Sequence, residues 1–261
     1  MAPSRFKRSR RPMARRTRKA RPTKISKAVK SYVKKAIHRN EENKVFINYA
    51  ANQSITTAGA GSNPTAINLV PLPVQGNTQN TRIGNTIKVV KGFVRGHVNL
   101  LPYSSTVNPN VGPCYVKMWL CSNKTINTTA ISGTNCSNDF FELGGSTTGF
   151  QGNMLDMELT NNRDNWTIYK TKTFELGTTS NDTLIGQVQS RIASDNSRFT
   201  RPFYFSFGRH MRKQIKFNDT QLAPTNINMF LLFQVVYADG SSTAITPAEY
   251  HYTSRVEYED A

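Results

Sequence analysis

The chain has 261 residues, enough for one large domain or two small ones, and it carries a formal net charge of +18. Of its 34 Lys and Arg residues, sixteen lie in the first 40 positions, ahead of the first carboxylate at Glu41. The rest of the chain therefore holds 18 basic against 16 acidic groups and is nearly neutral. No apolar run approaches the length of a membrane span, and the basic start lacks the apolar core of a secretory signal. We therefore expect neither a membrane protein nor a secreted one.

Residues 1–22 are dominated by arginine and contain Pro3, Pro12 and Pro22 but almost nothing apolar. A segment of this kind buries too little apolar surface to offset the entropy of ordering, so we expect a disordered arm. A positive arm on a near-neutral body indicates a polyanionic partner, because the release of counterions from a phosphate backbone drives such binding.

Residues 23–40 show a helical pattern instead. Apolar residues recur at helical spacing in a stripe formed by Ile25, Ala28, Val29, Tyr32, Val33, Ala36 and Ile37, and lysines occupy the other faces. Thr23 or Ser26 can cap the start of this helix. A helix of about 15 residues is marginal alone in water, so we predict that the stripe packs on the body while the lysines face phosphates. Binding to a membrane surface is the weaker alternative, because the stripe lacks Trp and Leu.

These two segments supply the expected nucleic-acid-binding residues, all of which are cations. They are Arg5, Lys7, Arg8, Arg10, Arg11, Arg15, Arg16, Arg18, Lys19, Arg21, Lys24, Lys27, Lys30, Lys34, Lys35 and Arg39. The same exposed cations suit a nuclear import signal, and the two uses need the same residues.

From residue 41 onward the pattern is that of strands joined by polar loops rich in Asn, Thr and Gly. The expected strands cover residues 44–50, 66–70, 86–101, 114–121, 166–176, 203–207, 215–217, 228–237 and 250–258. The segment 228–237 is continuously apolar and is expected to be buried on both faces, whereas 250–258 alternates and is expected to be half exposed. Gly92 and Gly96 predict bulges or close backbone approaches within the third strand.

Two long stretches, residues 122–162 and 177–202, lack a clear strand pattern. Loops of such length are usually functional, and in a β-sandwich we expect them at the sheet ends, where they can contact neighbouring subunits. Residues 183–193 fit a short helix or a strand. The glycines of 144–149 predict a flexible loop, because no lysine completes a phosphate cradle there.

No catalytic or metal-binding constellation is visible in the sequence. The four histidines, His38, His97, His210 and His251, lack metal-ligand spacing, and no nucleophile elbow, Walker loop or dinucleotide fingerprint is present. We therefore expect no enzyme, no metal site and no cofactor.

The cysteines and the paired carboxylates have ordinary structural interpretations. Cys114, Cys121 and Cys136 form no Cys-x-x-Cys pair, and their odd number argues against a disulfide framework and for a reducing compartment. We interpret Cys114 and Cys121 as small core residues. Asp156 and Glu158 are expected in solvent, because carboxylates without a pocket are usually solvated.

A second basic group follows the aromatic run at 203–207 and consists of Arg209, Arg212, Lys213 and Lys216. It suits further phosphate contacts, and it suits equally a solvated face or donors of intersubunit salt bridges. We interpret the run at 203–207 as core rather than as a base-stacking platform. Residues 91–95 (KGFVR) resemble the opening of an RNA-recognition motif and then depart from it.

Several segments, taken in order, resemble the capsid proteins of circovirus-like, Rep-encoding viruses with circular single-stranded DNA. The resemblance lies in the arginine-rich start, VKKAI at 33–37, ENK at 42–44, RIGNTIKVVKGFVRGHV at 82–98, DNWTIYKTKTFEL at 164–176, FYFSFGRHMRKQIKFN at 203–218, the strand at 228–237 and VEYED at 256–260. It spans most of the chain as an order of elements, and its individual motifs are weak.

The resemblance implies an all-β fold, a single eight-stranded antiparallel jelly roll of two packed four-stranded sheets at 41–261, behind the arm at 1–22 and the helix at 23–40. It implies a homo-oligomer of about sixty copies in a small icosahedral shell, with the arm inside on the genome and loops outside. It also implies a location in the virion and, during assembly, in the host nucleus. Host nuclear import receptors and a host surface receptor would be further partners.

The arm itself keeps two alternatives open. It mixes lysine and a helix where the arms of vertebrate circoviruses are denser arginine runs, so the coat protein of a small RNA or satellite virus remains an alternative. A non-viral nucleic-acid-binding protein with a basic extension is the other. Charge supports packaging independently, because about sixty arms would carry roughly 960 charges and neutralise on the order of a thousand nucleotides.

Overall fold

The computed structural model describes residues 26–40, 43–59, 62–76, 78, 80–102, 106–108, 112–125, 136, 138–177, 199–211, 214–219, 222–240 and 246–260. The chain divides into two compact units, residues 1–40 and residues 41–261, and each is described by itself. The undecided segment at 183–193 lies outside the described residues.

In the first unit the expected helix is present as α1 (Lys27–Asn40). Of the two proposed caps, Ser26 takes the role, because its Oγ accepts a hydrogen bond of 3.2 Å from the backbone N–H of Val29. Val29, Tyr32 and Val33 of the apolar stripe are exposed, with Tyr32 at 74%. The packing of this stripe on an apolar surface stays a prediction.

The second unit consists of strands, as expected from its sequence. They are β1 (Asn43–Ile55), β2 (Thr65–Asn68), β3 (Thr86–Leu100), β4 (Cys114–Asn123), β5 (Phe141–Leu143), β6 (Ser146–Thr148), β7 (Trp166–Leu176), β8 (Thr200–Ser206), β9 (Ile215–Lys216), β10 (Phe230–Tyr237) and β11 (Ala248–Asp260). Two short helical segments join them, α3 (Leu155–Glu158) and the 3₁₀ turn η2 (Gly208–His210).

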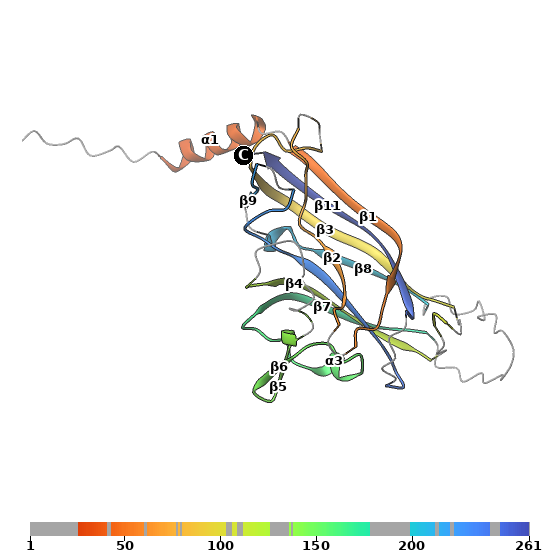
Figure 1. The fold of residues 1–261 in the computed structure, drawn as a ribbon. Helices are drawn as coiled ribbons and strands as arrows, with labels where there is room; N and C mark the ends of the chain where they lie inside the picture. The colour runs from red at the N-terminus through yellow and green to blue at the C-terminus, as the bar shows by residue number, and fades with distance from the viewer. Residues whose placement is uncertain are drawn as a thin grey trace, which may run out of the picture. The chain divides into compact units, whose positions relative to one another are not determined.

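The strand order defines a jelly roll. One sheet has the order β1-β11-β3-β8, and the other has the order β2-β10-β4-β7. All pairings within the two sheets are antiparallel. The chain therefore passes back and forth between two packed layers, which Figure 1 shows, and the expected all-β class is confirmed. The count differs from expectation, because β9 adds a fifth strand beside β3 and β5–β6 form a separate hairpin.

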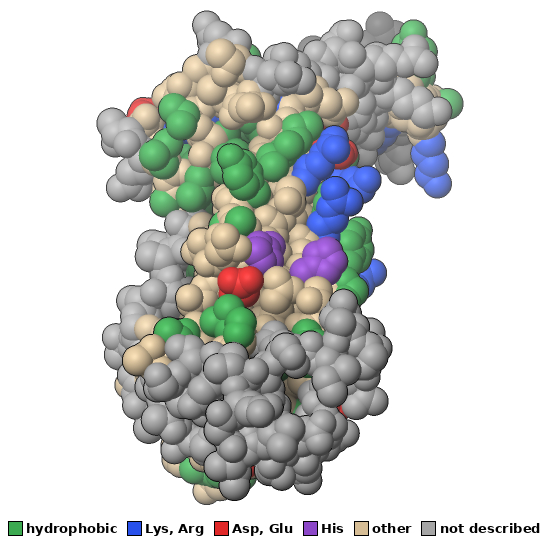
Figure 2. Space-filling view, turned by 90° about the vertical axis from the view of Figure 1, so that its right-hand side faces the viewer, with side chains coloured by type: hydrophobic (Ala, Val, Ile, Leu, Met, Phe, Trp, Pro, Cys, Tyr) green, Lys and Arg blue, Asp and Glu red, His purple; other side chains and the backbone are tan. Residues whose placement is uncertain are grey.

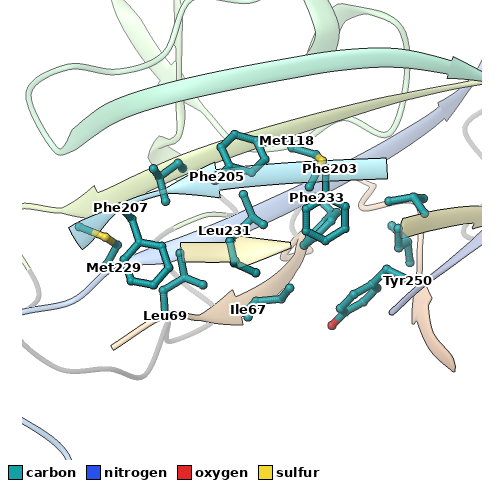
Figure 3. Packing of buried hydrophobic residues seen from close by; sticks show 14 of the residues in the cluster. Ile67, Leu69, Met118, Phe203, Phe205, Phe207, Met229, Leu231, Phe233 and Tyr250 are labelled. Carbon is teal, nitrogen blue, oxygen red and sulfur yellow. The ribbon is translucent and has the colours of Figure 1, made fainter. Parts of the chain in front are cut away.

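The main core lies between the two layers and is built from alternate residues of facing strands. Phe203, Phe205 and Phe207 enter it from β8 and the residue after it, and Leu231 and Phe233 enter from β10 (Figure 3). The interpretation of the 203–207 run as core is therefore confirmed for these three rings. All eight residues of β10 are buried, as expected, because each of its faces packs against a hydrophobic cluster.

The second cluster overturns the expectation of a long loop at 122–162. Phe140, Phe141 and Phe150 pack around Trp119 of β4, with ring centroids 5.5, 6.1 and 5.7 Å from it. The described residues 138–162 of this stretch thus include the hairpin β5–β6 and the helix α3, which lie over the outer face of the second sheet. Within it, Gly144 and Gly145 have positive φ values of 56° and 94° and form the tight hairpin turn. The expected flexible loop at 144–149 is therefore corrected to a hairpin.

Close packing inside the body explains the two glycines of β3 and the three cysteines. Gly92 and Gly96 both lie at close approaches, since a Cβ on either would meet Phe203, Phe207 or the carbonyl of His251 at less than 3 Å. Cys114, Cys121 and Cys136 are free and buried, as expected of core cysteines. Burial raises the pKa of the Cys114 thiol to about 12, which keeps it protonated and unreactive.

Candidate nucleic-acid interface

The cations expected to bind nucleic acid fall mainly outside the described residues. These are Arg5, Lys7, Arg8, Arg10, Arg11, Arg15, Arg16, Arg18, Lys19, Arg21 and Lys24. Lys27, Lys30, Lys34, Lys35 and Arg39 lie on α1, where Lys27 and Lys30 are exposed. The sequence of α1 contains no acidic residue, so all of its Lys and Arg residues lack an acidic neighbour within the helix.

The arm joins the body at β1, whose second residue, Lys44, is a buried cation with 1% of its side chain exposed. Its Nζ lies 2.7 Å from Oδ2 of Asp260 and donates a hydrogen bond of 2.9 Å to the carbonyl of Thr81. The same Oδ2 accepts a hydrogen bond of 3.2 Å from the backbone N–H of Ile83. One carboxylate at the end of β11 therefore fixes the start of β1 and residues 81–83 together.

Arg82 holds the same segment through a second set of contacts. Its guanidinium donates to the carbonyl of Gly84 at 2.7 Å and to Oδ1 of Asn85 at 2.9 Å, and it lies 4.6 Å from the centre of the Phe217 ring. Lys44 and Arg82 are thus structural cations, Lys44 at the start of β1 and Arg82 beside Phe217. Sequence reasoning missed both, because Asp260 and Phe217 lie far from them in the sequence.

The second basic group is only partly described. Arg209 lies in η2 and Lys216 in β9, and both side chains are exposed, whereas Arg212 and Lys213 lie outside the described residues. β9 pairs with the start of β3, and the backbone N–H of Phe207 beside η2 donates to the carbonyl of Gly92 in β3. The structure therefore places Arg209 and Lys216 on two elements that both adjoin β3.

His210 lies beside this group and contacts Tyr169 and Arg209. It stacks on Tyr169 with centroids 4.6 Å apart, and its Nε2 accepts a hydrogen bond of 3.0 Å from Nε of Arg209. Burial, followed by the charges of Arg209 and Lys170, lowers the pKa of His210. The ring lines a polar hollow of about 260 Å³ between β7 and η2. Lys124 is the cation among the residues that line this hollow.

The described residues contain no group of three or more His, Cys, Asp or Glu side chains placed to hold a metal ion. Among the helices of the described part, none is long and apolar enough to cross a membrane.

Two solved structures are similar to this chain at low scores. That of Desmodium yellow mottle tymovirus is 12% identical with a TM-score of 0.33, and the match covers 84% of this chain and 88% of that chain. That of the Macrobrachium rosenbergii nodavirus is 10% identical with a TM-score of 0.29, covering 99% of this chain and 61% of that chain. No family model and no curated protein matches the sequence. The fold assignment rests on the strand order itself.

Proposed function

We propose that this chain is a viral capsid protein that assembles into a closed shell and packages single-stranded nucleic acid with its N-terminal arm. The observation that carries the proposal is the segregation of sixteen cations ahead of a near-neutral jelly-roll body. Lectins and cupins share this topology with capsids, so the arm is the feature that favours a capsid. An arm of this charge binds a phosphate backbone by counterion release and needs no reading of base sequence.

The near-neutral body suits assembly. A body with 18 basic and 16 acidic groups lets many identical copies pack side by side without strong mutual repulsion. The buried ion pair of Lys44 and Asp260, here called the clamp, fits this arrangement, because it fixes the start of β1, the strand that follows the arm in the sequence.

Single-stranded DNA is the proposed cargo, and this choice depends on the sequence resemblance to circovirus-like capsids. An RNA cargo is the alternative, because the charge arithmetic of the arm serves either polymer. About sixty copies per particle and entry into the host nucleus belong to the same proposal.

Particles formed by the full chain test the proposal. We expect closed shells by electron microscopy, and we expect the extracted cargo to be destroyed by a single-strand DNase. A variant with all sixteen Lys and Arg of residues 1–40 replaced by Gln is expected to lose nearly all nucleic-acid affinity and most of its salt dependence. Monomers at every salt concentration would contradict assembly. Sequence preference that survives in the Gln variant would favour a non-viral binding protein instead.

A further inference from the structure

The outer face of the β1-β11-β3-β8 sheet carries aromatic and basic side chains in neighbouring rows. The register places Phe93 of β3 between Arg255 and Ser206, and it places Arg95 between Thr253 and Tyr204. Alternation along each strand turns these residues to the same side of the sheet, because their neighbours, such as Val94 and Phe205, are buried in the core. Figure 2 shows this side of the body, with blue Lys and Arg side chains gathered beside green hydrophobic ones.

The aromatic side chains on this face are open to a ligand. The rings of Phe93 and Tyr204 stack with centroids 5.9 Å apart and planes at 28°, and Tyr204 is 59% exposed. On the edge strand, Tyr49 of β1 is 76% exposed in the same row as Arg95, since both pair with Thr253. Exposed rings on a sheet are the geometry on which nucleobases stack.

Two cations of this face are available for phosphates. Lys91 and Arg95 lie four residues apart on β3, about 13 Å along an extended strand, so they can contact different nucleotides. Both side chains are exposed. Glu257 pairs with Lys91 in the register, but its carboxylate lies 3.1 Å from the guanidinium of Arg255. Among the ion pairs between described residues, none includes Lys91 or Arg95.

Chain connectivity joins the arm to this sheet. The sixteen cations of residues 1–40 are followed in the sequence by β1, which is an edge strand of this same sheet. The end of the arm is therefore only a few residues along the chain from the strand that carries Tyr49. The segment 91–95 of β3 supplies Lys91, Phe93 and Arg95.

From these observations we propose that this sheet face is a second, base-stacking contact surface for single-stranded nucleic acid. Phe93 and Tyr204 stack on bases, and Lys91 and Arg95 hold phosphates. The inference rests on the proposed function, since it assumes that nucleic acid is the polyanion held by the arm. It goes further, because the arm alone contacts only the backbone, whereas this face contacts bases.

The test uses the full chain and a single-stranded oligothymidine that carries photoreactive 5-iododeoxyuridine. We expect crosslinks in the peptide that contains Tyr204 or the peptide that contains Phe93. Tyr204→Ser is expected to weaken binding about fivefold to tenfold, and Tyr204→Phe is expected to restore it. Arg95→Gln is expected to reduce the slope of log affinity against log salt by about 0.7. Matched controls are Leu222→Ser and Arg163→Gln, which change exposed side chains outside this face.

Each variant must first unfold at the same denaturant concentration as the wild type, so that a change in binding is not caused by a loss of stability. Three outcomes then contradict either the stacking surface or the proposed function. Crosslinks confined to arm peptides, with unchanged affinity in Tyr204→Ser and Arg95→Gln, overturn the stacking surface and leave packaging by the arm intact. Normal affinity with loss of particles in Tyr204→Ser identifies the face as a contact between copies and also overturns the inference. Failure of the full chain to bind any single strand overturns the proposed function itself.

Discussion

At Gly96 the first sheet has no room for a side chain. A Cβ at this position would lie 2.0 Å from the carbonyl oxygen of His251 and 2.7 Å from Cζ of Phe203. The carbonyl belongs to the backbone of β11 and cannot rotate away, so Gly96→Ala must push β3 from β11. We expect a loss of about 3 kcal/mol in the free energy of unfolding, measured with denaturant. Gly59→Ala is the control, because a Cβ there meets nothing within 4 Å. Equal stability of the two variants would contradict the close approach.

Asp156 corrects the expectation of a solvated carboxylate, because its side chain is fully buried. Its Oδ1 accepts from the N–H of Gln151 at 2.8 Å, and its Oδ2 accepts from the N–H of Gly152 at 2.8 Å and from Nε2 of Gln234 at 2.7 Å. Burial raises the pKa of Asp156, although these hydrogen bonds oppose the shift. The carboxylate joins the segment around α3 to β10 of the sheet beneath it.

The raised pKa of Asp156 makes a prediction about pH. A carboxyl group whose pKa is higher in the folded state binds protons more tightly when folded, so its contribution to stability is lost as pH rises through that folded value. The Asp156→Asn variant lacks this titrating group. Its free energy of unfolding should therefore fall less than that of the wild type between about pH 4 and about pH 7. At about pH 7 the variant should still be less stable by about 2 kcal/mol, because its amide NH₂ faces the donors on Gly152 and Gln234. The control is Glu158→Gln, an exposed carboxyl on the same helix. Parallel pH profiles for wild type and Asp156→Asn would refute the assignment.

Among the elements, the junction of β1 and β11 depends on one buried ion pair. Asp260→Ala removes the counter-charge of Lys44, and we expect a loss of about 2–3 kcal/mol, since a buried cation is left without that carboxylate. Adding Lys44→Met should recover part of this loss, because an apolar side chain suits the buried site. Denaturant unfolding measures both. Arg255→Gln breaks an exposed pair and should cost less than about 1 kcal/mol. If Asp260→Ala matched Arg255→Gln, the clamp would have no special role.

The helix α1 is an element that requires a partner surface. Its 14 residues are too few for a stable isolated helix in water, and Val29, Tyr32 and Val33 are exposed along one stripe. We therefore expect that Tyr32→Ser with Val33→Ser speeds amide hydrogen exchange in α1 of the full chain by about tenfold, through loss of apolar packing. Lys30→Ser with Lys34→Ser is the control, because it changes residues of the other faces. Equal exchange in both double variants would show that the stripe packs on nothing.

Periodicity predicted most strands because a sheet with one buried face imposes a two-residue repeat on its sequence. The strand Trp166–Leu176 has the expected bounds, and β10 is buried on both faces as its apolar run indicated. The stretch at 122–162 could not be predicted in the same way, because its order depends on aromatic contacts with Trp119 that no local pattern encodes. For the interface, the sequence located the cations of the arm. It could not reveal the buried partners of Lys44 and Arg82 or the exposure of Tyr204, which depend on contacts between segments far apart in the sequence.

For the whole molecule, the proposed function implies that the length of the packaged strand depends on the positive charge of the arms. If the arms neutralise the packaged strand, its length should follow the number of cations that each copy brings inside. Ten of the sixteen arm cations lie in residues 1–22 and six in residues 23–40, so deletion of residues 1–22 leaves α1 and its lysines in place. The two parts of the arm can thus be separated without touching the jelly roll.

We expect particles of the chain lacking residues 1–22 to hold about three-eighths to four-ninths of the wild-type cargo length, measured on extracted nucleic acid. The lower bound counts arm cations alone, and the upper bound counts the net charge of the whole chain. A matched variant keeps the full length but replaces the ten cations of residues 1–22 by Gln, and it should package the same reduced amount. Unchanged cargo in the Gln variant would mean that length is set by the internal volume of the shell. Reduced cargo in the deletion alone would mean that the chain length of the arm matters and its charge does not.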